Sequence, residues 1–547
     1  MDDSAGSCQS SRKHDQEDMS MAHWHRSLFA TVALSLAASQ VGAQTPMKVL
    51  KVVPSADVAE LDPTRAANQI GRIYAQMVFD SLFALDHTLS PKPMMVEKEE
   101  VSDDGLTYRF TLRPGLRFHD GSAVTTRDVV ASLERWMAGS SVGGQLKSRL
   151  NGMSIVDDRT FVLTLGKRFG LVEFVLAGAG APMAAIMREA DARRPEGDRI
   201  TNPIGSGPFR YNAALRESGH RVVFDRNPDY PARAEPPDGA AGAKIVKVDR
   251  VEWDIMPDPV TAANALATGE VDFWDTVTPD VIPFLKSRGV TVRRTASLQA
   301  TVWIRPNFEL PPFDNVKARQ ALAALFDQKE FMQAVAGDSG WSTCYSFSVC
   351  GSTLGTEIGS DPYRSPDPAR AKQLLAESGY KGEPVVVVGT PQLPVINAVT
   401  QVMAHKLRDI GVNVDVQMGD WATVYKQVNT PHLQMGHGGW NLVGTYSLGG
   451  TWFNPLTNVA LDTSCGPAAT SNMGMPCDEE GERLRQAVLA APDEQSRRAA
   501  FEAFQQHMWT FIPYIPGGQF DINNAYRKNI SGVLDGYVIN YWNIEKN

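Results

Sequence analysis

The stretch from Tyr108 to Trp136 constrains the fold of this chain more than any other. Apolar and polar side chains alternate over residues 108–113, and this period of two is typical of a half-buried strand. An Asp-Gly pair at 120–121 then predicts a tight turn. Thr125 precedes Asp128 by three residues, an arrangement that caps a helix, and apolar residues recur behind it at helical spacing. The stretch therefore predicts a strand, a turn and a helix in succession, as in many α/β proteins.

The same stretch resembles a signature of periplasmic solute-binding proteins of the peptide/nickel type (extracellular solute-binding protein family 5), which serve ABC importers. That family carries F-x-L-R-x-G-x-x-F-H-D-G, followed by a helix of the form A-x-D-V-x-x-S-L. The matching residues here are Phe110, Leu112, Arg113, Gly115, Phe118, His119, Asp120, Gly121, Asp128, Val129, Ser132 and Leu133. Thr126 stands where the family usually has alanine.

Further segments resemble the family in the same order along the chain. They are Asn202–Tyr211 (P-x-G-[ST]-G-P-[FY]), Arg226–Tyr230 (R-N-P-x-Y), Gly269–Asp272 (G-E-[IVL]-D), Pro312–Ala321 (P-F-D-[DN]-x-x-[VA]-R-Q-A) and Asp367–Tyr380 (D-P-x-x-A-x-x-L-L-x-x-x-G-Y). The resemblance implies a two-lobed α/β fold of the type II periplasmic-binding-protein (Venus-flytrap) class, with two crossing strands as a hinge. It places lobe one at 44–86, 202–305 and 515–547, an inserted subdomain of lobe one at 87–201, and lobe two at 306–514.

Residues 1–43 have the character of an export signal with a polar extension. Basic residues at 23–26 precede an apolar run at 27–38, and the small residues that end at Ala43 suit cleavage. The run is too short to span a bilayer. Because no cysteine follows it, we expect no lipid anchor and a freely soluble periplasmic protein, cleaved near Ala43.

Composition excludes several classes of protein. A chain of 547 residues is too long for one hydrophobic core, and two to four domain-sized units are expected. The 53 basic and 62 acidic residues give a net charge of −9, and neither sign is concentrated. Without a basic patch, no nucleic-acid partner is expected. Composition shows no interface for oligomers, so a monomer is expected only because the family implies it.

The cysteines agree with an exported protein. Cys8 lies in the segment expected to be removed, which leaves Cys344, Cys350, Cys465 and Cys477. Four cysteines allow three connectivities, and the spacings favour two local bridges, Cys344–Cys350 and Cys465–Cys477. A zinc site would use C-x-x-C pairs, and the sequence contains none. Disulfides are therefore favoured over a metal site.

Signals of catalysis are weak. Residues 337–340 read G-D-S-G, as in trypsin-like proteases, but Trp341 replaces the glycine that follows and no matching histidine segment lies upstream. The sequence has no H-E-x-x-H or G-x-x-x-x-G-K-[ST]. We therefore expect no enzyme, with a secreted hydrolase or peptidase acting through Ser339 as the alternative. A third alternative, a nickel-chelate or haem receptor, rests on His432 and His437, but a pair of loop histidines more often lies at the surface or contacts a ligand, and no metal or cofactor is assigned.

The stretch Met435–Pro455 is the main candidate for ligand binding. It holds two tryptophans, one tyrosine, one phenylalanine and six glycines. Glycines let a backbone approach a ligand closely, and aromatic side chains provide rigid walls with polar tips. The predicted contacts in this stretch are His437, Trp440, Asn441, Tyr446 and Trp452. The alternative is an aromatic core strand with a glycine-rich loop.

This stretch also departs from the resemblance. Peptide-binding relatives commonly carry G-W-x-x-D followed by D-P, and one of those aspartates pairs with the peptide amino terminus. Here no acidic residue lies between Asp420 and Asp462. Because burying a substrate ammonium without an anion is costly, a neutral, anionic or chelated solute becomes more attractive than a free peptide. Gln69, Trp274 and Gln392 are further candidate contacts, each of which could equally serve packing.

Together these observations predict the periplasmic substrate-binding component of an ABC importer. It would capture a small organic solute, peptide-like or not, between two closing lobes and deliver it to the permease subunits of the inner membrane. The sequence does not identify the solute.

Overall fold

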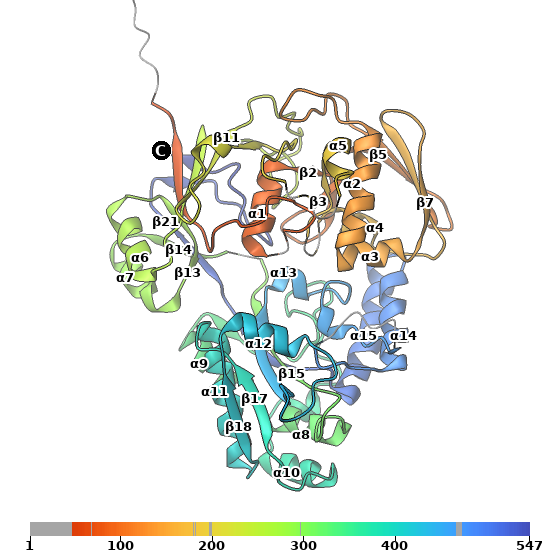
Figure 1. Cartoon of the computed structure of the whole chain (residues 1–547), viewed down its shortest axis with the longest axis vertical. Helices are drawn as coiled ribbons and strands as arrows, with labels where there is room; N and C mark the ends of the chain where they lie inside the picture. The colour runs from red at the N-terminus through yellow and green to blue at the C-terminus, as the bar shows by residue number, and fades with distance from the viewer. Residues whose placement is uncertain are drawn as a thin grey trace, which may run out of the picture. The chain divides into compact units, whose positions relative to one another are not determined.

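Two large sheets organise the chain, and each is built from segments far apart in the sequence (Figure 1). The computed structural model describes residues 46–547 except 67, 179, 181, 196–197, 199, 296 and 467–472. The predicted signal peptide, its cleavage position near Ala43, and Cys8 lie outside the described residues. Met47–Asn547 form one compact unit.

The seven-stranded sheet has β1 (Val49–Val53) at its centre, parallel to both of its neighbours. Leu50, Val52 and Val53 are buried, because a strand covered on both faces needs apolar side chains. In sheet order the strands are β10 (Phe209–Tyr211), β11 (Arg221–Arg226), β12 (Arg250–Asp254), β1, β13 (Phe273–Val277), β21 (Asn523–Tyr526) and β14 (Thr291–Arg294).

The six-stranded sheet is built from the second half of the chain. In sheet order its strands are β16 (Trp341–Ser342), β20 (Ile515–Phe520), β15 (Ala300–Pro306), β19 (Leu442–Ser447), β17 (Val385–Gly389) and β18 (Val414–Met418). Helices α9 (Gln328–Ala336) and α11 (Pro394–Asp409) pack on it through close approaches. A Cβ added to Gly518 would meet Met332 of α9 at 2.6 Å, and one added to Gly444 would meet Val399 of α11 at 2.3 Å.

The chain passes between these two sheets twice. It leaves the seven-stranded sheet after β14 and enters the six-stranded sheet at β15, and it returns from β20 to β21. The two passages are joined, because Thr295 N donates to Ile522 O at 2.7 Å and Gln299 Nε2 donates to Asp521 Oδ1 at 2.9 Å. This is the arrangement expected of a two-strand hinge.

The stretch that opened the sequence analysis folds as predicted. Its first strand, β6 (Thr107–Leu112), lies inside a four-stranded sheet of order β5 (Val96–Val101), β6, β8 (Thr160–Leu165) and β7 (Leu150–Ile155). The helix α2 (Thr126–Gly139) follows, and its capping box is present: Thr125 N donates to Asp128 Oδ2 at 2.8 Å. The side chain of Trp136 at the end of the stretch is 1% exposed and donates to Pro182 O.

Shorter elements complete the description. The remaining α-helices are α1 (Gln69–Val78), α3 (Ser141–Lys147), α4 (Val172–Leu176), α5 (Glu189–Ala192), α6 (Pro259–Thr268), α7 (Ile282–Ser287), α8 (Val316–Leu325), α10 (Pro368–Glu377), α12 (Trp421–Val428), α13 (Gly449–Trp452), α14 (Glu479–Ala490) and α15 (Glu494–Phe511). The remaining strands are β2 (Asp80–Ser81), β3 (Phe83–Leu85), β4 (Pro91–Pro93), β9 (Ala185–Ile186), β22 (Ile530–Ser531) and β23 (Glu545–Lys546). Among the described helices, none combines the length and apolar character needed to cross a bilayer.

The division of the chain into lobes stays a prediction, and strand pairing bears on two of its boundaries. The sequence analysis placed 300–305 and 515–547 with lobe one. Strands β15 and β20, however, hydrogen-bond to each other within the six-stranded sheet. We therefore propose that lobe two runs from about residue 300 to 520, with the hinge at 295–299 and 521–522.

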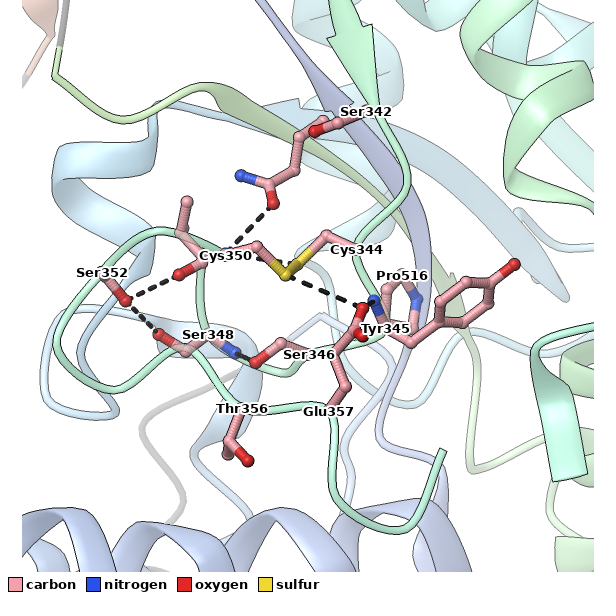
Figure 2. Close-up of a disulfide and its surroundings, with 12 residues drawn as sticks. Ser342, Cys344, Tyr345, Ser346, Ser348, Cys350, Ser352, Thr356, Glu357 and Pro516 are labelled. Carbon is pink, nitrogen blue, oxygen red and sulfur yellow. Dashed lines mark hydrogen bonds between the residues drawn. A yellow bond between two sulfur atoms is a disulfide. The ribbon is translucent and has the colours of Figure 1, made fainter. Parts of the chain in front are cut away.

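Both predicted disulfides are confirmed. Cys344 and Cys350 are bonded, and so are Cys465 and Cys477. Figure 2 shows the first bridge closing a short loop, with Glu357 beside it and the hydroxyl groups of Ser348 and Ser352 in contact at 3.1 Å. Because its two sulfur atoms are bonded to each other, this cysteine pair is a cross-link and not a pair of metal ligands.

Candidate functional site

Two of the predicted contacts, Trp440 and Asn441, lie in the core of the six-stranded sheet. Trp440 is 1% exposed and packs among valines of β17, α12 and β19. Asn441 is fully buried, and its side chain accepts from Val386 N and donates to Pro311 O, each at 2.8 Å. These contacts favour a structural role for both residues over the predicted ligand contact, which remains untested.

Trp274 and Gln392 also have structural partners. Trp274 on β13 is 5% exposed and packs with Val53 and residues of α6. Gln392 is exposed, and its Oε1 accepts from the backbone N of Trp421 at 2.9 Å, at the start of α12. Their predicted contact with a ligand therefore has no support from their surroundings.

His437 is exposed in a turn, where its backbone N donates to Gln434 O. His432 is exposed as well, and its ring contacts Glu309 at 2.5 Å. Among the described residues, the one grouping of three potential metal-ligating side chains is Cys344, Cys350 and Glu357, which includes neither histidine. The receptor for a metal chelate thus gains no support from this pair.

The glycines of the predicted stretch line a cavity of about 540 Å³ that includes Gly436, Gly438 and Gly439. Its other lining residues lie between 311 and 435, within the half of the chain that contains the six-stranded sheet. A ligand held there would contact only one of the two expected lobes, so this cavity is a poor candidate for a site that closes around a solute.

Tyr446 and Trp452 lie on opposite faces of the six-stranded sheet. Tyr446 pairs with Val302 and its ring meets Phe520 at 5.6 Å, on the face that α9 covers. Trp452, in the short helix α13, stacks on Trp303 with 4.8 Å between ring centroids. Neighbouring residues of a strand point to opposite faces, so Val302 and Trp303 lie on different faces of the sheet. Helix α13, which contains Trp452, therefore lies on the face that carries Trp303.

The Trp303 face carries buried polar atoms that have no partner. Thr301 and Gln519 are directly opposed on β15 and β20 and share this face with Trp303. Thr301 Oγ1 and Gln519 Nε2 are buried, and neither has a hydrogen-bond partner among the described residues. Because buried polar groups are usually paired, such atoms mark a place where another molecule is expected.

The orientation of Gln519 is set by the disulfide loop. Its Oε1 accepts from Cys350 N at 3.1 Å, which fixes the oxygen toward the loop and leaves the Nε2 donor unpaired. The same loop is attached to the sheet by Gln328, whose Nε2 donates to Cys344 O at 2.8 Å and to Pro516 O at 2.9 Å. The loop therefore presents a fixed hydrogen-bond donor on the Trp303 face.

A second group of polar side chains comes from α1. Gln69, Arg72 and Gln76 are spaced three and four residues apart and share one face of this helix. Gln69 is partly exposed, whereas Arg72 and Gln76 are 6% and 5% exposed. Gln76 Nε2 donates to the hydroxyl of Tyr537, and its Oε1 is buried without a partner among the described residues. The predicted contact Gln69 thus lies beside polar groups that the sequence analysis missed.

Tyr537 connects the two polar groups. A Cβ added to Gly450, on α13, would lie 2.6 Å from the Cβ of Tyr537. Next to it, Gly536 O accepts from Ser297 N at 3.2 Å in the first hinge passage. The face of α1, the C-terminal segment, the hinge and α13 therefore meet. We propose that they form one site together with the unpaired groups on the Trp303 face, which α13 joins through the stacking of Trp452 on Trp303. We call it the junction site and define it by Arg72, Gln76, Thr301, Gln519 and Tyr537.

The inserted subdomain makes separate contacts with the half that contains the six-stranded sheet. Gly170 N donates to Leu489 O at 3.0 Å, and Arg497 Nη2 donates to Gly170 O at 2.7 Å. The Phe174 and Phe453 rings meet edge to face at 5.6 Å. Gly170, Phe174, Phe453 and Arg497 border a cavity of about 280 Å³. Among the described residues, the halves of the chain are thus in contact at the inserted segment as well as at the junction site, and the junction site lies beside the hinge.

The candidate nucleophile Ser339 has no catalytic surroundings. It is exposed in the turn that follows α9, and no hydrogen bond joins it to a histidine among the described residues. An activated serine requires such a base within hydrogen-bond reach. The geometry around G-D-S-G therefore lends no support to a hydrolase.

The sequence analysis missed most of the junction site. One signal was present: α1 is otherwise apolar, and its polar residues recur at 69, 72 and 76, on a single face. Thr301 and Gln519 gave no signal, because their burial depends on strand pairing between segments that are distant in sequence.

The family "bacterial extracellular solute-binding proteins, family 5, middle" matches residues 90–456. A probable peptide ABC transporter periplasmic-binding protein of Sinorhizobium fredii is 36% identical over 527 residues, which covers 95% of this chain and 98% of that protein.

Two solved structures have the same fold. A periplasmic binding protein of A. tumefaciens R10, in complex with agropinic acid, superposes with a TM-score of 0.76 at 22% identity and covers 91% of this chain and 99% of its own. An ABC transporter-associated periplasmic binding protein of Helicobacter pylori, in complex with the peptide STSA, gives 0.75 at 19% identity, with 91% and 98% coverage. The predicted two-lobed type II fold is thereby confirmed.

Proposed function

The chain belongs to the bacterial extracellular solute-binding proteins of family 5, and we propose that it is the substrate-binding component of an ABC importer that takes its solute at the junction site. The protein is exported with cleavage near Ala43, acts as a monomer in the periplasm, and presents its loaded form to the permease subunits. No bond of the solute is made or broken. The relative from Sinorhizobium fredii, named as a probable peptide transporter component, supports the transport role.

One observation carries the placement of the site. Buried polar atoms that have no hydrogen-bond partner among the described residues come from two parts of the chain: Gln76 Oε1 from α1, and Thr301 Oγ1 and Gln519 Nε2 from the six-stranded sheet. A solute that pairs with atoms on both sides would favour the state in which the two sides are together. Such differential binding is what a receptor needs if a transporter is to distinguish its loaded form.

The test begins with the mature protein from Gln44 purified under native conditions. We expect that mild denaturation releases a defined solute, identified by mass spectrometry, and that the refolded protein rebinds it with quenching of tryptophan fluorescence. The double variant Thr301→Val/Gln519→Met, which removes the unpaired groups, should bind it at least tenfold more weakly. Full binding by this variant would refute the junction site, and hydrolysis of the released solute would refute a receptor without catalysis.

A further inference from the structure

Arg72 differs from every other buried cation among the described residues. Six basic side chains are less than one-tenth exposed: Arg72, Arg149, Lys244, Arg305, Arg319 and Arg485. Lys244 pairs with Asp80 at 2.9 Å, and Arg485 pairs with Glu482 at 2.7 Å. Both therefore have the counter-ion that a buried charge requires.

Apart from Arg72, three of these arginines lack a close carboxylate, and each of the three has other partners. Arg319 Nη1 donates to Phe313 O at 2.9 Å and its guanidinium lies over two aromatic rings. Arg305 Nη1 donates to Pro513 O at 2.6 Å, and Arg149 Nη1 donates to Gln145 O at 2.6 Å. Carbonyl oxygens and ring faces stabilise these cations in place of an anion.

The guanidinium of Arg72 forms no hydrogen bond, ion pair or ring contact with any described residue, and its Nε is fully enclosed. Burial lowers the pKa of Arg72, and the nearby Tyr537 acts against this shift. No carboxylate contributes to the pKa of Arg72. A buried, unpaired guanidinium is costly, and the fork of donors that it presents fits a carboxylate.

We propose that Arg72 binds an anionic group of the transported solute, so that the solute of this receptor is an organic acid whose carboxylate enters the junction site. Gln76 Oε1 beside it accepts from a hydroxyl or amide of the same molecule, and Gln519 Nε2 donates to an acceptor on the opposite side. Arg305, fully buried behind Trp303, adds positive charge on that side. The proposal rests on the proposed function and names the chemical class of its solute.

The first test needs no knowledge of the solute. Ligand-free mature protein is titrated with propionate and with propionamide, which share one shape and differ in charge, while sodium chloride keeps the ionic strength constant. Four forms are compared: wild type, Arg72→Gln, Arg72→Lys, and Arg127→Gln as a control at an exposed position of the same half of the chain. The readout is the melting temperature.

We expect propionate, and not propionamide, to raise the melting temperature of the wild type and of Arg127→Gln by roughly 1–2 °C at saturation. Arg72→Gln should show no such rise, and Arg72→Lys a smaller one. Without additive, Arg72→Gln should melt no lower than the wild type, because it removes an uncompensated buried charge. An equal rise in Arg72→Gln, no rise in the wild type, or a lower melting temperature of additive-free Arg72→Gln would overturn the assignment.

The second test uses the solute released from the purified protein. Arg72→Gln should bind it at least tenfold more weakly than the wild type and Arg127→Gln. A released solute without an acidic group would overturn the inference and leave the receptor function intact. Mass spectrometry also separates the two sources of a carboxylate, the end of a peptide and a non-peptide acid.

Discussion

The backbone N–H of Cys350 donates to Oε1 of Gln519 at 3.1 Å, so a loop closed by a disulfide orients an amide on the strand that leads into the hinge. This contact joins the Cys344–Cys350 cross-link to the side of the junction site that lies on the six-stranded sheet. It gives the disulfide a role in recognition besides its role in stability.

Replacing both Cys344 and Cys350 by serine should therefore weaken binding of the released solute severalfold, because the loop no longer holds the Gln519 amide in one orientation. The melting temperature should also fall, since the loss of a local cross-link costs roughly 2–3 kcal/mol. Calorimetric titration measures the affinity. The Cys465→Ser/Cys477→Ser double variant is the control, which should lose stability and retain affinity; equal losses of affinity in the two variants would contradict the role of Gln519.

Trp440→Ala should reduce stability strongly and leave the affinity of the folded protein unchanged. The side chain packs among valines in the core, and removal of such a tryptophan costs about 3–5 kcal/mol. Denaturant unfolding and titration of the soluble fraction measure the two effects. A weaker affinity with unaltered stability would restore the ligand contact that the sequence suggested for Trp440.

Gly450→Ala should weaken solute binding by roughly fivefold or more. The added Cβ would lie 2.6 Å from Cβ of Tyr537, so the C-terminal segment and α13 would have to separate. Gly152→Ala is the matched control, because a Cβ there meets nothing within 4 Å. Unchanged affinity in Gly450→Ala, measured beside this control, would show that the close approach is not needed for binding.

Asp275 should make the protein less stable as the pH rises. Its side chain is fully buried on β13, its carboxylate has no hydrogen-bond partner among the described residues, and burial raises its pKa to about 7. The usual pKa of an unfolded aspartate is about 3.9, so the folded state binds the proton more tightly. The free energy of unfolding therefore decreases between about pH 4 and pH 7 and levels off above, by an amount on the order of a few kcal/mol.

Asp275→Asn should remove this dependence. The variant should gain stability relative to the wild type as the pH is raised from 5 to 8, as measured by urea unfolding at both values. Asp258→Asn, at an exposed helix cap, provides a comparison that carries no such burial. If the free energy of unfolding changed with pH equally in Asp275→Asn and in the wild type, Asp275 would not titrate in this range.

Local patterns predicted local structure well. The strand, turn and capped helix within 108–136 follow from neighbours in sequence, and the cysteine spacings led to both disulfides. The two-lobed fold came from the resemblance of motifs over the whole chain. The lobe boundaries near the hinge were harder to predict, because β15 and β20 are assigned to the six-stranded sheet by pairing between segments that are distant in sequence.

The ligand site was harder to predict, since it depends on which face of an element is covered. Trp440 and Asn441 lie in a stretch with the composition expected of a binding site. The side chain of Asn441, however, is hydrogen-bonded to the backbone N of Val386, 55 residues away in the sequence. Arg72 on a helix would ordinarily be assigned to the surface. Its burial follows from Tyr537, which bonds to Gln76 across 461 positions of sequence.

The position of β21 has a consequence for the order of folding. This strand comes from the last 25 residues of the chain, yet it lies inside the seven-stranded sheet, between β13 and β14. That sheet cannot be completed, and β14 cannot join it, until nearly the whole polypeptide has been synthesised. The four-stranded sheet of β5, β6, β8 and β7 is built from strands that are neighbours in sequence and can form earlier, so the seven-stranded sheet is expected to be among the last parts of the chain to fold.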